Sequence, residues 1–180
     1  MKIIDILIDS ANFLGLNSEM EILQNTTQDD ENQVLQDNEK IRSLFNLIQF
    51  SVKELCTNYI PMITNVDIVT EEKQYPISSL ENYIRIQNVF KDNIATKFKI
   101  INRNLIFDED GCYMVSYSSF PTINSMFEDI DFLQDFSPDA IVFGLCSYFS
   151  LAHGMFDEFE RFHEKYIMKA ESLKDIRNFQ

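Results

Sequence analysis

A continuous apolar stripe at helical spacing, between Glu39 and Tyr59, is the feature that most constrains how this chain of 180 residues can fold. Pro61 follows it, and because proline lacks the amide hydrogen that a helix interior needs, the helix is predicted to end there. A stripe of this length needs an apolar partner surface, so we expect the helix to lie in a helical core. The stripe consists of Ile41, Leu44, Phe45, Ile48, Val52, Leu55, Cys56 and Tyr59.

Two short segments precede this helix. Residues 3–14 place their apolar side chains on one face at helical spacing, and Gly15 is typical of the left-handed residue that follows a helix end. Residues 25–38 are polar, with only Val34 and Leu35 apolar. This polar stretch is interpreted as a loop or as the start of the next helix, where acidic residues are favourable.

The last third of the chain predicts an αα-hairpin. Ser137, Pro138 and Asp139 combine a capping serine, a first-turn proline and an early acid, which together favour a helix start. The residues that follow are apolar nearly all round, so this helix is expected at the centre of the fold. Gly154 breaks it, and a final helix is predicted over residues 156–176. Its apolar face consists of Phe159, Phe162, Tyr166, Ala170 and Leu173.

The middle third changes from helical to alternating periodicity. Short runs rich in β-branched and aromatic residues predict a small antiparallel sheet inserted between helices. Asp110-Gly111 lies between the last two runs, and such a pair predicts a tight hairpin turn because glycine accepts a positive φ. The runs are residues 66–70, 83–90, 95–101, 104–107 and 112–117.

These elements predict an α+β fold that is mainly α: a helical bundle with a C-terminal αα-hairpin and a small antiparallel β insert. Residues 1–65 are assigned to the N-terminal helices of a helical body, and residues 66–120 to the β insert. Residues 121–180 are assigned to the C-terminal helices that complete the body. The length fits one compact domain with an inserted lobe.

The net charge of −14 limits the kinds of molecule that the protein is expected to bind. An acidic surface repels phosphate backbones and anionic membranes, which argues against binding to nucleic acid or lipid. It suits partners with positive patches, or a surface past which nucleic acid slides. No apolar run approaches the roughly 20 residues that span a bilayer. The N-terminus lacks a signal peptide's basic start, and three widely spaced cysteines predict free thiols in a reducing compartment.

Four residues near the C-terminus could suggest a metal site: His153, Asp157, Glu160 and His163. Glu-x-x-His is half of the di-iron pattern of helical bundles, but the other half needs a second such motif and the chain has only two histidines. We therefore predict that these side chains are solvated on the outer face of the last helix.

Other candidate chemistry is also weak. Asp108 could begin a calcium loop, but position twelve is Ser119 instead of the required glutamate, so a hairpin turn is preferred. Cys146 has apolar neighbours and no adjacent base, which predicts a core residue instead of a nucleophile. No phosphate loop or dinucleotide motif occurs. We predict a protein that is not an enzyme, without catalytic, cofactor-binding or metal-binding residues and without a cofactor.

Two stretches carry a resemblance to a known family. They are ILIDSANFLGL at residues 6–16 and LAHGMFDEF at residues 151–159. The first is similar to the first helix of tailed-bacteriophage head-to-tail connector (adaptor) proteins, which ends in a Leu-Gly-Val-like step. The second resembles that family's closing helix, Gly step and aromatic-acidic helix start. Between them the family has a polar loop, an amphipathic helix, here residues 41–59, and a small β insert as in tail-tube A proteins.

The resemblance implies a structural virion protein of the neck. It would form a ring of twelve copies beneath the portal protein, assembled in the host cytoplasm. The ring would extend the DNA channel, let genomic DNA pass without specific binding, and provide a platform for tail or neck proteins, with no membrane contact. Two alternatives stay open. One is a soluble helical adaptor or regulatory protein that binds a partner peptide at the last helix pair. The other is a small metal-dependent enzyme built on the four residues near the C-terminus.

Overall fold

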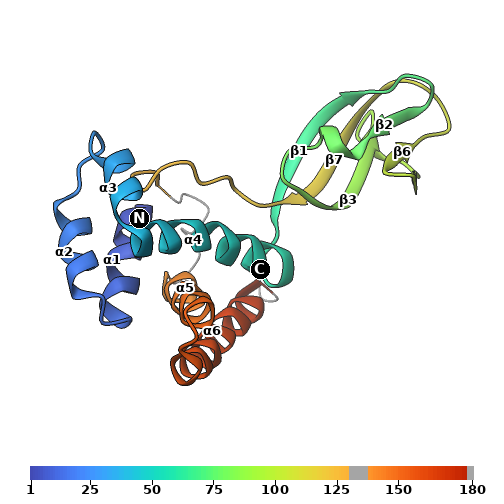
Figure 1. Ribbon diagram of the computed structural model, residues 1–180. Helices are drawn as coiled ribbons and strands as arrows, with labels where there is room; N and C mark the ends of the chain where they lie inside the picture. Colours follow the sequence, from blue (N-terminus) through green and yellow to red (C-terminus); the bar gives the residue numbers. More distant parts are fainter. Residues whose placement is uncertain (130–137, 178–180) are drawn as a thin grey trace. The chain divides into compact units, whose positions relative to one another are not determined.

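The computed structural model describes residues 1–129 and 138–177. This part of the chain contains six α-helices and seven β-strands. The chain divides into two compact units: a helical unit made of Met1–Leu55 and Thr122–Gln180, and a β unit made of Cys56–Pro121. Both units are drawn in Figure 1.

The prediction of a mainly helical bundle with a small β insert is wrong. The protein is α+β with two antiparallel sheets in its described residues, and these strands form a compact unit of their own. The physical reason is that the β unit buries a hydrophobic core of its own, to which side chains of both sheets contribute. That core consists of Ile68, Ile77, Leu80, Val89, Leu105, Phe107, Tyr113, Val115 and Tyr117.

The first helix of the helical unit, α1 (Ile3–Phe13), ends as predicted. Gly15 has φ +68°, and the amide of Leu16 donates to the carbonyl of Ala11 at 2.9 Å. Helix α5 (Asp139–Ala152) ends in the same way: Gly154 has φ +71°, and the amide of Met155 donates to the carbonyl of Ser150 at 2.9 Å. Glycine is favoured at both positions because it adopts a positive φ without steric cost.

Helix α3 (Glu31–Asp37) occupies part of the polar stretch 25–38, interpreted from the sequence as a loop or as the start of the next helix. Helix α2 (Asn17–Asn25) precedes that stretch, where no element is predicted from the sequence. Leu23 is the fully buried apolar residue of these two helices. Helix α3 is held by polar contacts: the buried Glu31 carboxylate accepts hydrogen bonds at 2.6 Å from the amide of Met126 and from the hydroxyl of Ser125. These partners lie more than 90 positions away, so no local pattern could reveal them.

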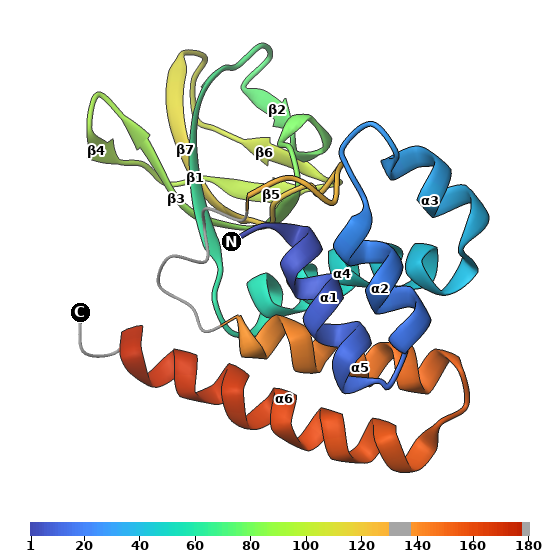
Figure 2. The same ribbon diagram turned by 90° about the vertical axis from the view of Figure 1, so that its left-hand side faces the viewer.

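The other helices confirm their predictions. They are α4 (Glu39–Asn58), α5 and α6 (Phe156–Arg177). Helix α5 is buried on most sides, as expected of a central helix, and α6 lies beside it (Figure 2). The capping role predicted for Ser137 falls on a residue outside the described part of the chain.

Tyr166 of α6 joins these three helices. Its ring is fully buried, and a Cβ atom added to Gly144 of α5 would lie only 3.1 Å from it, so the glycine permits the close approach of α5 and α6. Its hydroxyl donates at 3.0 Å to the carboxylate of Glu54 in α4, and the hydroxyl of Tyr148 in α5 donates to the same oxygen. Hydrogen bonds to a charged acceptor are stronger than neutral ones.

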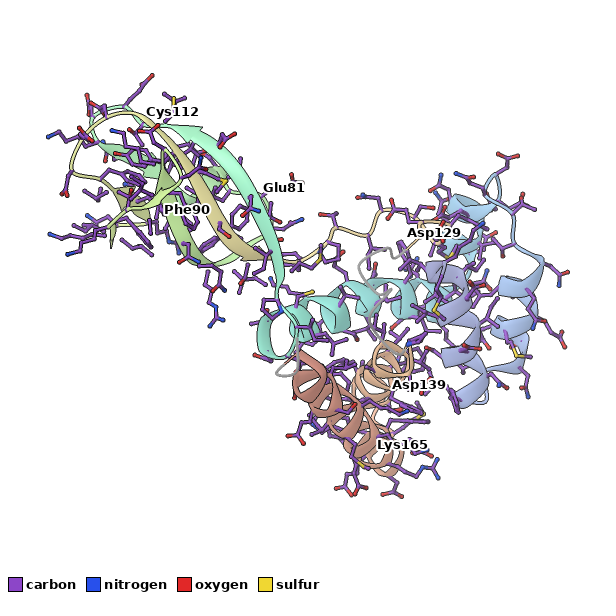
Figure 3. All side chains as sticks on the ribbon, turned by 180° about the vertical axis from the view of Figure 1, so that it is seen from behind. Glu81, Phe90, Cys112, Asp129, Asp139 and Lys165 are labelled. Atoms are coloured by element: carbon purple, nitrogen blue, oxygen red, sulfur yellow. The ribbon has the colours of Figure 1, made fainter. Side chains whose placement is uncertain are left out.

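The β unit contains a four-stranded sheet in the order β1-β7-β3-β4 and a three-stranded sheet in the order β2-β6-β5. All neighbouring strands are antiparallel. Its side chains are drawn with those of the helical unit in Figure 3. The elements are β1 (Met62–Val69), β2 (Gln74–Pro76), a 3-10 turn (Ile77–Ser79), β3 (Tyr83–Lys91), β4 (Ile94–Ala95), β5 (Lys99–Ile101), β6 (Asn104–Ile106) and β7 (Cys112–Ser119).

The turns differ from the prediction. The predicted hairpin at Asp110-Gly111 is wrong, because β6 and β7 belong to different sheets. The Asp110 carboxylate instead accepts the backbone amide of Lys73 at 2.6 Å. The single strand predicted over residues 95–101 is also wrong, since the chain crosses there from β4 in one sheet to β5 in the other.

Two-residue turns close the hairpins on either side of that crossing. Asp92 and Asn93 have φ of 51° and 63°, and Asn102 and Arg103 have φ of 50° and 62°. Positive φ at both central residues is the signature of the type I′ turn, whose twist matches that of antiparallel strands. Asparagine and aspartate, which occupy three of these four positions, tolerate this conformation better than most residues.

Phe149 and Phe45 are both expected from the sequence to lie in the helical core, but their burial differs. Phe149 is 1% exposed, whereas Phe45 is only half-buried. Phe149→Ala should therefore lower the free energy of unfolding by about 3–5 kcal/mol, and Phe45→Ala by clearly less. Urea denaturation followed by circular dichroism measures both. An equal decrease in the free energy of unfolding for the two variants would contradict the difference in burial between Phe149 and Phe45.

Candidate interaction surfaces

The four candidate metal ligands do not come together. Asp157 and Glu160 are exposed on α6. The ring of His153 stacks on Phe149 with a centroid distance of 3.9 Å, and its Nδ1 lies 2.9 Å from that residue's carbonyl oxygen. Over residues 1–129 and 138–177, no group of three or more His, Cys, Asp or Glu side chains could hold a metal ion.

His163 corrects one expectation. It is half-buried instead of solvated, and its Nδ1 lies 3.3 Å from the hydroxyl of Ser147 in α5. Its ring also stacks on Phe159 one turn earlier in α6, with a centroid distance of 5.1 Å. His163 lies one turn after Phe159, at the edge of the apolar face, and the hydroxyl of Ser147 gives its ring a polar neighbour there.

Cys146 is a core residue, as predicted. It is fully buried in α5, and its Sγ lies 3.6 Å from the backbone carbonyl of Ser10 in α1. Burial raises the pKa of its thiol to about 12, which keeps the sulfur protonated near neutral pH. A thiol in this state is a poor nucleophile.

Charge is divided unequally between the two units. The helical unit holds 21 acidic and 9 basic residues, a net charge of −12. The β unit holds 8 acidic and 6 basic residues, a net charge of −2. Most of the net negative charge of the chain therefore belongs to the helical unit. A partner that approaches the two units meets different electrostatic surfaces.

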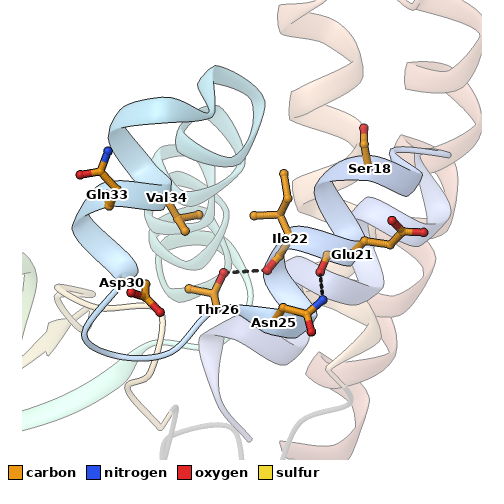
Figure 4. A pocket seen from close by; sticks show the side chains of 8 residues that line it. All are labelled: Ser18, Glu21, Ile22, Asn25, Thr26, Asp30, Gln33 and Val34. Atoms are coloured by element: carbon orange, nitrogen blue, oxygen red, sulfur yellow. Dashed lines mark hydrogen bonds between the residues drawn. The ribbon is translucent and has the colours of Figure 1, made fainter.

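A groove lies between α2 and α3, in a stretch rich in acidic residues. Residues 17–39 contain seven acidic residues and no basic one. The groove has a volume of about 670 Å³ and an apolar part made by the half-buried side chains of Ile22 and Val34 (Figure 4). The exposed carboxylates of Glu21 and Asp30 also line it. The remaining lining residues are Ser18, Asn25, Thr26 and Gln33.

The β unit exposes apolar side chains beside positive charges. Ile94 in β4 is 71% exposed, and Ile100 and Ile101 in β5 are 52% and 50% exposed. Both strands are at sheet edges, where backbone groups on the outer side are open to a further strand or chain. The segment around β5, residues 97–103, contains Lys97, Lys99 and Arg103 and no acidic residue.

This exposed edge was not apparent from the sequence. Residues 95–101 look like one strand, and isoleucine is as typical of an inner strand as of an outer one. The signal that could have located it is the pair of short polar turns on either side, Asp92-Asn93 and Asn102-Arg103. Once the turns are placed, the run divides into two short strands, β4 and β5, instead of one long strand.

Comparison of the sequence with models of known protein families and with curated proteins finds no match. Within the described residues, none of the helices combines the length and the apolar character needed to cross a membrane.

The three cysteines should differ in their reactivity. Cys112 is exposed at the first residue of β7 (Figure 3), whereas Cys56 and Cys146 are buried. At pH 8 a thiol-specific reagent such as Ellman's reagent should label one thiol per folded chain, and all three after denaturation. Cys112→Ser should remove the fast reaction. Rapid labelling of Cys146 in the folded protein would contradict its burial.

Proposed function

We propose that this chain is a structural subunit of a tailed bacteriophage, a head-to-tail connector that forms a ring beneath the portal protein. In this role it extends the DNA channel and carries the tail or neck proteins, and it performs no catalysis. The observation that carries the proposal is the division of one chain into a strongly acidic helical unit and a nearly neutral β unit with exposed, partly apolar strand edges.

Different surfaces on the two units favour a ring. A subunit that contacts its neighbour through two unlike patches makes a heterologous interface, and repeating that interface around an axis closes a ring. The acidic groove at α2 and α3 and the basic edge at β5 are two such unlike patches. A subunit that assembled only through one self-complementary patch would stop at a dimer.

The charge of the helical unit suits a wall past which DNA moves. Twelve excess negative charges per chain repel the phosphate backbone, so DNA in such a channel gains no counterion-release energy from binding the wall. A channel protein needs this property because the genome must leave quickly and completely. A basic helical unit would instead hold the DNA.

The order of elements also supports the proposal. The two stretches that resemble the connector family each contain a helix end at a left-handed glycine, at Gly15 and at Gly154. Between them come the amphipathic helix α4 and a β region, in the order in which the family has them.

The proposal predicts that the chain is a component of the virion neck. Mass spectrometry of purified virions should detect it at about the copy number of the portal protein, and cryo-electron microscopy should place it as a ring below the portal. Native mass spectrometry after mixing it with portal rings should give a discrete complex. A major capsid protein fragment of similar size serves as the control for non-specific adsorption. Absence of the chain from purified virions would refute the proposal.

A further inference from the structure

The edge strand β5 has properties of a docking element. Its three residues, Lys99–Ile101, are all exposed, and it has a strand neighbour only on the side of β6 within the part of the chain that the structure describes. Lys97, Lys99 and Arg103 make no ion pair with the described residues. By contrast, Lys91 at the end of β3 is paired with Glu109 at 2.6 Å. Three unpaired cations and two half-exposed isoleucines thus lie within seven residues.

The α2–α3 groove has the complementary properties. The carboxylate of Glu21 makes no hydrogen bond or ion pair with the described residues, and Asp30 accepts only the hydroxyl of Thr27, at 2.6 Å. The polar groups at the end of α2 are already satisfied: Asn25 and Thr26 donate to the carbonyls of Glu21 and Ile22 at 2.7 and 2.8 Å (Figure 4). The groove therefore offers free carboxylates around an apolar part and few unsatisfied donors.

We infer that the β5 segment of one copy, residues 97–103, docks into the α2–α3 groove of a second copy. Lys97 and Lys99 pair with the carboxylates of Glu21 and Asp30, while an isoleucine of β5 covers the apolar part of the groove. The inference rests on the proposed function, since it names the contact by which ring neighbours recognise each other. It adds the chemistry of that contact: a basic and apolar strand edge against an acidic helical groove.

The occupant is a second copy because the two surfaces complement each other in charge and in apolar character. The β5 segment has three basic residues and no acidic one, whereas the groove is lined by the carboxylates of Glu21 and Asp30 and by no basic residue. Every copy carries both surfaces, so each can receive one neighbour and dock into the next. This is the heterologous arrangement that a ring needs.

Salt sets the conditions under which the contact can be tested. Two copies with a charge of −14 each repel one another at long range. At about 0.15 M ionic strength the Debye length is about 8 Å, so this repulsion is largely screened while pairs in direct contact persist. The experiments are therefore done at this ionic strength.

The first experiment uses zero-length carbodiimide cross-linking, which joins lysine amines to carboxylates in direct contact. Equal amounts of unlabelled and 15N-labelled wild-type chain are mixed at high concentration and cross-linked. Mass spectrometry should find peptides in which Lys97 or Lys99 is joined to Glu21 or Asp30, with half of the cross-links of mixed isotope. Cross-links of a single isotope only would place the contact within one chain and overturn the inference. Absence of these cross-links would also overturn it.

The second experiment reverses charges on each surface in turn and measures self-association by sedimentation velocity. One variant is Lys97→Glu with Lys99→Glu, and the other is Glu21→Lys with Asp30→Lys. The self-association constant of each variant alone should be about tenfold lower than that of the wild type, because like charges then face each other. A 1:1 mixture of the two should recover wild-type association, since each reversed surface meets an opposite one on its neighbour. Wild-type association by either variant alone, or no recovery on mixing, would overturn the inference.

Matched controls carry the same change in net charge elsewhere. Lys73→Glu with Arg85→Glu changes exposed cations of the β unit, and Glu160→Lys with Glu164→Lys changes exposed acids of α6. Both should associate as the wild type does. Loss of association in the controls to the same extent would show that net charge alone governs assembly, and would refute the docking contact. Presence of the chain in virions tests the connector function separately, and that function survives if neighbours meet through other surfaces.

Discussion

The helical unit depends on the burial of one tyrosine. Tyr166 has no exposed surface, and its ring occupies space that any side chain larger than hydrogen at position 144 would fill. Its hydroxyl cannot reach water from there, so it needs a partner in the protein. Glu54 supplies that partner and binds Tyr148 as well, which couples α4 to both helices of the C-terminal pair. Hydrogen bonds to a charged group contribute about 1.5–3 kcal/mol each, and this shared carboxylate therefore fixes how the three helices pack.

How far the sequence predicts the fold depends on where the stabilising contacts lie. Helices α4, α5 and α6 are predictable because their contacts are apolar and recur at helical spacing, which a local window detects. Helix α3 is not, because it is fixed by Glu31, a residue type expected on the surface, through hydrogen bonds to Ser125 and Met126. The number of sheets cannot be predicted from the sequence for a related reason. A strand pattern shows that residues alternate, but not which strand lies beside which.

The candidate interaction surfaces, too, are predictable only where they depend on local sequence patterns. The burial of Cys146 follows from its apolar neighbours in the sequence, and so could be predicted. The exposure of Ile100 and Ile101 could not, because it results from the position of β5 at the edge of a three-stranded sheet. The net charge of the whole chain does not show how charge is divided between the units, because the boundaries of the β unit, Cys56–Pro121, became known only with the structure. The acidic groove required α2 and α3 to be recognised as helices.

The register of the four-stranded sheet has a consequence for how such a protein can change over evolution. Met62, the first residue of β1, pairs with Ser119, the last residue of β7. Paired residues in antiparallel strands have Cα atoms about 4.5–5.5 Å apart, so the β unit starts and finishes at nearly one point. A module with adjoining ends can be gained, lost or exchanged by recombination without stretching the host fold, as insertions between domains generally show. The same helical unit can thus carry different inserted β units, each with a surface that binds a different neighbouring protein.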